Sequence, residues 1–192
     1  MTDAAVPEGR IVTRTQGRVL TITIDRPHKY NAFTPEMFGQ LAEAYTAYEN
    51  DDGLWCAVLL AKGPHFTAGL QLDRFTITDQ FATEGLVDPL GLLPPLRRKP
   101  VVCGVHGICF TIGIELMLAT DVVVAASDTR FAQLEVQRGL LPFGGATIRF
   151  VERAGWGNAM QWLLTGGEFD GTEAMRLGLV QELHPAAEVQ AR

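Results

Sequence analysis

The chain has 192 residues, of which 47% are hydrophobic and 20% charged, a composition typical of one soluble globular domain. Its formal net charge of −6 and its single basic cluster, Arg97-Arg98-Lys99, argue against a nucleic-acid-binding surface. No apolar stretch reaches the roughly 18 residues of a membrane-spanning helix, so we expect neither nucleic acid nor membrane as a partner.

The three cysteines predict reduced thiols. Cys56, Cys103 and Cys109 lie among apolar residues, as buried free cysteines do. Cys103, His106 and Cys109 are evenly spaced, but they lack a fourth partner and match no common ligand spacing, so we expect no metal site. The N-terminal MTDAAVPEGR lacks the basic and apolar parts of a secretory signal. These features together predict a cytoplasmic protein.

The first half of the chain predicts a hairpin, a helix and a buried strand, in that order. Alternating β-rich residues between 11 and 24 favour two paired strands. Thr34-Pro35-Glu36 is typical of a helix start, and apolar residues then recur at helical spacing up to Asn50. The apolar run 55–61 predicts a buried strand, and the turn His65–Leu72 leads into a short helix. The region from Thr76 to Leu96 is expected to be a loop.

Residues 99–121 form the most apolar part of the chain. They predict a buried strand at Val101–Val105, a tight turn at His106-Gly107, and then a helix that is apolar on every side. That helix contains one carboxylate, Glu115, with no cation three or four positions away. Because an unpaired charge in a core is costly, Glu115 needs a structural or functional explanation, and the pattern leaves both open.

The second half continues to alternate strands and helices, which indicates the α/β class. We expect strands at 122–126 and from Thr129, a helix through Ile148 and Val151, a helix at 156–164, a helix at 173–177 capped by Thr172, and a last strand opening at Leu179-Val180.

Three segments could carry chemistry. The turns before residue 72 and before Glu115 both lead from a strand into a helix, where free backbone amides can bind an anionic oxygen. The first could equally be an ordinary turn. In the third segment, Glu135 could act as an acid or base, or could form a surface ion pair with Arg138. The chain has no dinucleotide or nucleotide-phosphate glycine motif.

Taken together, these segments resemble the crotonase, or enoyl-CoA hydratase/isomerase, superfamily. The resemblance covers nearly all of residues 10–183. It rests on Asp25-Arg26-Pro27 with Asn31-Ala32-Phe33, His65 to Leu70, Gly107 to Glu115-Leu116 and Asp121, Phe131-Ala132-Gln133-Leu134-Glu135 with Gly139 to Pro142, and Gly178-Leu179-Val180. It implies one crotonase-like domain over 1–192 with its core at 10–183, folded as the crotonase (ClpP-like) spiral of ββα units. It also implies that the family's C-terminal helical trimerisation region is absent here, and that a homotrimer or hexamer forms where that region is present.

The resemblance also implies a site. The backbone N–H groups of Leu70 and Ile112 match an oxyanion hole for a thioester oxygen, and Glu115 and Glu135 match the two catalytic glutamates of hydratases. The implied substrate-binding residues are Ala68, Gly69, Leu70, Gln71, Leu72, Asp73 and Ile112. The implied reaction adds water to an α,β-unsaturated acyl-CoA, with Glu115 deprotonating water and Glu135 protonating Cα. It uses no cofactor, because coenzyme A is part of the substrate.

Two alternatives stay open: a Δ3,Δ2-enoyl-CoA isomerase, and an acyl-CoA-binding protein that has lost catalysis. The chain departs from the family at Gln71, where an acid is common, and at Thr111-Ile112-Gly113, where consecutive glycines are common. We expect the Ile112 side chain to narrow the acyl pocket.

Overall fold

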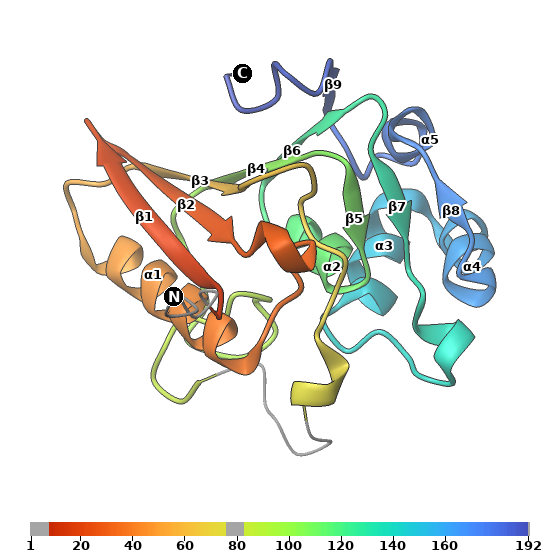
Figure 1. The fold of residues 1–192 in the computed structure, drawn as a ribbon, viewed down its shortest axis with the longest axis horizontal. Helices are drawn as coiled ribbons and strands as arrows, with labels where there is room; N and C mark the ends of the chain where they lie inside the picture. The colour runs from red at the N-terminus through yellow and green to blue at the C-terminus, as the bar shows by residue number, and fades with distance from the viewer. Residues whose placement is uncertain (1–7, 76–82, 192) are drawn as a thin grey trace, which may run out of the picture.

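A six-stranded sheet forms one layer of the fold (Figure 1), which we describe from a computed structural model covering residues 8–75 and 83–191. The strand order is β1-β2-β3-β4-β6-β9. The first two strands form the predicted antiparallel hairpin, and every other pairing in this sheet is parallel. The strands are β1 (Arg10–Gln16), β2 (Val19–Asp25), β3 (Cys56–Ala61), β4 (Val101–Val105), β6 (Val122–Ala126) and β9 (Glu182–His184).

A second, three-stranded sheet consists of β5 (Ile108–Phe110), β7 (Arg130–Ala132) and β8 (Glu168–Phe169). The chain passes from β4 to β5 and from β6 to β7, so each pair contributes one strand to each sheet. Helix α2 (Ile112–Leu118) follows the first pair and helix α3 (Ala146–Ala154) the second. This repeated path is the predicted spiral of ββα units.

The remaining helices surround these sheets. Helix α1 (Pro35–Asn50) lies beneath the large sheet in Figure 1 and begins as predicted, because the Thr34 hydroxyl accepts the Met37 N–H at 3.3 Å. The others are α4 (Trp156–Thr165), α5 (Gly171–Arg176) and the 3-10 turns η1 (Pro27–Lys29), η2 (Leu72–Arg74) and η3 (Glu135–Arg138). None of the helices in the described ranges has the length and apolar character needed to cross a membrane.

The structure corrects the predicted start of the helix that carries Glu115. The helix begins at Ile112 and does not follow directly from Gly107, because Ile108–Phe110 forms strand β5. The Phe110 N–H donates to Thr67 O at 3.0 Å on one side of this strand, and β7 pairs with its other side. An apolar run of three residues fits a strand or a helix equally well, so only these distant partners decide its structure.

Two predictions near the C-terminus were also wrong. Helix α5 is capped by Asp170, whose carboxylate accepts the Glu173 N–H at 2.9 Å, and not by Thr172. The last strand begins at Glu182 instead of Leu179. The expected loop from Thr76 to Leu96 lies partly outside the described residues, and its described part, 83–96, contains turns and bends but no helix or strand.

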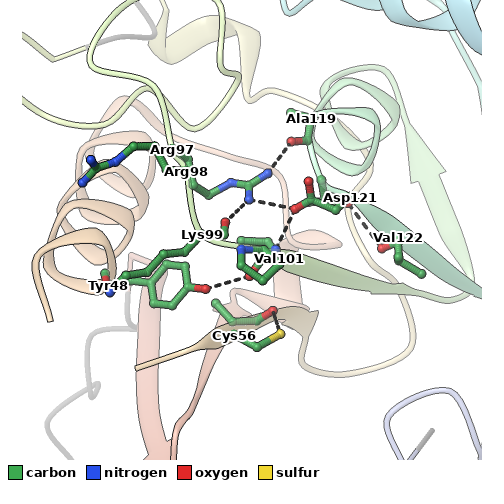
Figure 2. Close-up of polar contacts among 12 residues, drawn as sticks. Tyr48, Cys56, Arg97, Arg98, Lys99, Val101, Ala119, Asp121 and Val122 are labelled. Atoms are coloured by element: carbon green, nitrogen blue, oxygen red, sulfur yellow. Dashed lines mark hydrogen bonds and ion pairs between the residues drawn. The ribbon is translucent and has the colours of Figure 1, made fainter. Parts of the chain in front are cut away.

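An ion pair fastens the C-terminal end of α2 to the start of β4 (Figure 2). The Arg97 guanidinium donates to Asp121 Oδ2 at 2.8 Å and to Ala119 O at 3.0 Å. The same Asp121 oxygen accepts the Val101 N–H at 2.8 Å. One carboxylate therefore joins the end of the helix to the neighbouring strand.

Asn31 fastens a second junction, between the end of β2 and the turn that follows β3. Its side chain is fully buried; Oδ1 accepts the Arg26 N–H at 2.7 Å, and Nδ2 donates to Lys62 O at 2.9 Å and His65 O at 2.7 Å. Its φ of 55° lies in the left-handed region, which asparagine tolerates better than most residues. Asn31 thus holds two loops together with one buried and two partly buried hydrogen bonds.

We expect Asn31→Ala to lower the free energy of unfolding by about 3 kcal/mol, because it leaves one buried N–H and two partly buried carbonyls without the amide that pairs them. Urea unfolding monitored by circular dichroism measures this change. The matched control is Asn50→Ala, at the exposed end of α1, which should change stability by less than about 0.5 kcal/mol. Equal losses in the two variants would contradict the role given to Asn31.

Candidate active site

Glu115 lies in the middle of α2, a helix in which all seven residues are buried. Its side chain is 2% exposed, and Oε1 accepts the Ala146 N–H at 3.1 Å at the start of α3. Burial raises the pKa of this carboxyl to about 8; the Ala146 N–H opposes the rise, and the nearby Glu135 charge adds to it. Glu115 is thus a buried acid that holds its proton near neutral pH.

Gly144 makes room for this carboxyl. A Cβ atom at position 144 would lie 2.5 Å from Glu115 Oε2, closer than any real carbon–oxygen contact. Glycine is therefore required here by close approach to the acid. The partners of Glu115 come from a turn about 30 residues further along the chain.

Glu135 lies three residues after the last residue of β7 and opens the η3 turn. Gln133 Nε2 donates to Glu135 Oε1 at 3.0 Å, and Glu135 Oε2 is buried without a hydrogen-bond partner in the described part of the chain. Burial raises the pKa of Glu135, and the Gln133 hydrogen bond opposes the rise. The expected alternative, an ion pair with Arg138, is not among the ion pairs of the described residues.

Glu135 lies near enough to Glu115 for its negative charge to add to the rise in the pKa of Glu115, after burial. The raised pKa of Glu115 does not fit the role expected for it. We expected Glu115 to take a proton from water, but in the free protein near neutral pH it already carries one. Burial raises the pKa of both carboxyls, and the charge of Glu135 adds to the rise for Glu115.

The two turns with the expected oxyanion donors lie against each other. The Thr67 N–H donates to Ile108 O at 3.1 Å, so the chain before Leu70 runs beside β5. A Cβ atom on Gly69 would lie 2.5 Å from Thr111 Oγ1, which places the residue before Leu70 against the residue before Ile112. Within residues 8–75 and 83–191, neither the Leu70 nor the Ile112 N–H has a hydrogen-bond acceptor.

The other expected substrate-binding residues lie in one continuous segment, Ala68 to Asp73, which we call the strap. The Ala68 N–H already donates to Tyr30 O at 3.0 Å, and the Gln71 N–H to Phe33 O at 2.9 Å, so these two bonds fix the strap on either side of Leu70. Leu72 and Asp73 are exposed. Gln71, at the position where the family often has an acid, has a buried Oε1 with no partner in the described residues.

Sequence reasoning missed the residues that support the glutamates. Gln133 belongs to the segment Phe131–Glu135 that carries the family resemblance. Its position two residues before Glu135 was the only sequence feature that could have indicated a contact with that carboxyl. No sequence pattern indicated the Ala146 N–H or Gly144 as partners of Glu115, because they contact it only in the folded chain.

The predicted effect of Ile112 on an acyl pocket stays a prediction. This residue is 2% exposed and packs in the core. No group of three or more His, Cys, Asp or Glu residues in the described ranges is placed to hold a metal ion.

Comparison with known proteins agrees with this fold. The family model described as enoyl-CoA hydratase/isomerase matches residues 14–192. The crystal structure of a probable enoyl-CoA hydratase/isomerase from Mycobacterium abscessus is 48% identical, with a TM-score of 0.91 over 94% of this chain and 71% of that one.

Two curated relatives have different reactions in their names. The 1,2-epoxyphenylacetyl-CoA isomerase of Escherichia coli (strain K12) is 31% identical over 90% of this chain and 69% of its own length. The mevalonyl-coenzyme A hydratase of Beauveria bassiana is 32% identical over 88% of this chain and 65% of its own length. The chain thus spans about two thirds of the length of these relatives. It belongs to the enoyl-CoA hydratase/isomerase family and has the crotonase fold.

Proposed function

We propose that the protein adds water to an α,β-unsaturated acyl-CoA thioester. The observation that carries the proposal is the electrostatic coupling of two glutamates with unlike surroundings, Glu115 and Glu135. The backbone N–H groups of Leu70 and Ile112, which have no acceptor among the described residues, lie on adjoining turns of the same fold. Hydration of an enoyl thioester needs an acid, a base and a stabilised carbonyl oxygen.

The thioester oxygen would accept hydrogen bonds from Leu70 and Ile112. Attack at Cβ moves negative charge onto this oxygen, and fixed amides stabilise that charge without reorganising. A donor of this kind is worth about 3–4 kcal/mol in a water-poor site. The strap from Ala68 to Asp73 would lie beside the coenzyme A part of the substrate.

The glutamate pair would supply the proton transfers. The water oxygen bonds to Cβ while one carboxylate takes a proton from that water. The other glutamate gives its proton to Cα, so the pair holds one proton before and after the reaction. Glu115 carries that proton in the free protein because burial favours its neutral form. The reaction needs no cofactor, because coenzyme A arrives as part of the substrate.

A Δ3,Δ2-enoyl-CoA isomerase is the second candidate, and it needs only one well-placed base. The presence of both acids favours hydration. An acyl-CoA-binding protein without catalysis is the third candidate, and the departure at Gln71 is the feature that favours it. Assembly as a homotrimer or hexamer and a cytoplasmic location stay predictions.

We expect Glu115→Gln and Glu135→Gln each to lower the rate of crotonyl-CoA hydration by roughly a hundredfold or more, because each removes a proton-transfer group. Loss of the enoyl absorbance measures the rate. Glu43→Gln, an exposed position on α1, is the matched control and should keep wild-type turnover. Near-normal rates in either active-site variant would reject the two-acid mechanism, and product analysis with a 3-enoyl-CoA would reveal isomerisation.

The same variants separate the two glutamate roles. Exchange of the Cα hydrogens of butyryl-CoA in D₂O requires only the group that acts at Cα. Loss of this exchange in Glu135→Gln alone supports the expected division, and loss in Glu115→Gln alone supports the reverse.

Glu115 should also make stability fall as the pH rises. The unfolded chain releases this proton near pH 4.5 and the folded chain near pH 8, so the folded state binds more protons between these values. The expected loss of unfolding free energy from this group between pH 5 and pH 8 is about 3–4 kcal/mol. We therefore expect the stability of Glu115→Gln, relative to wild type, to increase over this range.

Urea unfolding at several pH values measures the difference. Glu43→Gln should follow the wild-type curve. Parallel curves for Glu115→Gln and wild type would show that the Glu115 carboxyl is not held neutral by the fold.

A further inference from the structure

The imidazole of His65 connects the two turns that carry the expected oxyanion donors. It lies five residues before Leu70, and its Nδ1 accepts the Ile108 N–H at 3.2 Å, four residues before Ile112. The Ile108 carbonyl in turn accepts the Thr67 N–H at 3.1 Å. Both backbone groups of Ile108, the first residue of β5, are therefore bonded to the chain that leads to Leu70.

The ring is closely packed at this junction. It stacks on the ring of Tyr30, with 5.2 Å between the ring centroids. A Cβ atom on Gly107 would lie 2.6 Å from His65 Nδ1 and 2.0 Å from Pro64 O. Because only a glycine leaves this space, the ring nitrogen lies directly against the backbone of the turn between β4 and β5.

The bond between His65 and Ile108 requires an uncharged ring. A ring nitrogen that accepts a hydrogen bond carries no proton, so the neutral imidazole has its proton on Nε2. The charged ring has a proton on both nitrogens, and its Nδ1–H would then face the Ile108 N–H. A hydrogen bond with the Pro64 carbonyl favours the charged ring. Protonation therefore removes Ile108 as a partner of the ring and leaves Pro64.

We propose that neutral His65 is a positioning residue for the oxyanion hole: its Nδ1 fixes the spacing of the Leu70 and Ile112 turns, and protonation of the ring releases this contact and slows the reaction in mild acid. The proposal deepens the hydratase function and rests on it for the statement that these two amides bind the thioester oxygen. A misplacement of about 1 Å can cost roughly a hundredfold in rate, so a loosened turn has a measurable effect.

The surroundings of His65 favour the neutral ring at pH 7. Burial lowers the pKa of His65, and the charges of His106, which follows β4, and Arg130, on β7, lower it further. Tyr30 stacks on the ring, and Arg130 also pairs with Glu168. The contact with Ile108 is therefore present at neutral pH and is lost as the pH falls below about 6.5, the ordinary pKa of histidine.

Two substitutions separate the acceptor from the ring. Phenylalanine keeps a ring but has no acceptor, whereas asparagine places Oδ1 as many bonds from the backbone as Nδ1 and does not titrate. In crotonyl-CoA hydration at pH 7.5, His65→Phe should lower kcat roughly tenfold with little change in KM, and His65→Asn should keep the wild-type kcat. The matched control is His28→Phe, an exposed position in η1, which should keep wild-type kinetics. Wild-type kcat in His65→Phe, or equal losses in the two His65 variants, would overturn the proposal.

The pH dependence tests the protonation step. Both proteins contain the same glutamates, so the titration of those acids cancels from the ratio of kcat in His65→Asn to kcat in wild type. We expect this ratio to rise as the pH falls from about 7.5 to about 5.5, because only wild type loses its acceptor. A constant ratio would overturn the release of the contact by protonation.

NMR of nitrogen-labelled protein without substrate tests the contact itself. The Ile108 amide signal should shift with the same midpoint as the His65 ring signals, and this shift should be absent in His65→Asn. An Ile108 signal that does not follow the ring would overturn the proposal. If wild type does not turn over crotonyl-CoA, the proposed function fails while NMR still decides the contact. If His65→Phe does not fold by circular dichroism, the kcat ratio and the NMR titration of His65→Asn decide the proposal.

Discussion

A carboxyl group without a cationic partner is buried in the central helix, and the surrounding structure is arranged to hold it. Two sheets and α3 exclude water from α2, and the cost of burying Glu115 is reduced because its proton stays bound and the Ala146 N–H binds one oxygen. Gly144 leaves the space that this contact requires. Gly144 and Ala146 lie in the one turn that leads into α3, so the environment of the acid depends on the packing of this turn against α2.

Two residues of the same type acquire different properties from their neighbours. Glu115 meets a backbone amide inside the core, whereas Glu135 lies at the end of a strand and meets the Gln133 side-chain amide. A glutamate in a drier environment keeps its proton, and a glutamate that accepts a strong donor releases it more readily. The two carboxyls thus have unlike surroundings, which is what the proposed hydration requires of an acid and a base.

Local patterns were sufficient to predict the elements that local rules control. The hairpin, the Thr34 cap of α1 and strand β3 follow from alternation, capping and a short apolar run. Strand β5 was missed because three apolar residues fit a strand or a helix equally well. The cap at Asp170 was missed because Asp170 and Thr172 are both good capping residues. The glutamates were found through resemblance; their partners were not, because those contacts form only when distant turns pack together.

The ion pair between Arg97 and Asp121 fixes the C-terminal end of α2. The helix has seven residues and is about 10 Å long, so it has little freedom to bend along its length. Its far end is fastened by a carboxylate whose side chain is 52% exposed, while its middle carries the buried acid. Because the same Asp121 oxygen accepts the Val101 N–H, the end of the helix and the start of β4 share one attachment point. The position of the acid on α2 is therefore set relative to the large sheet.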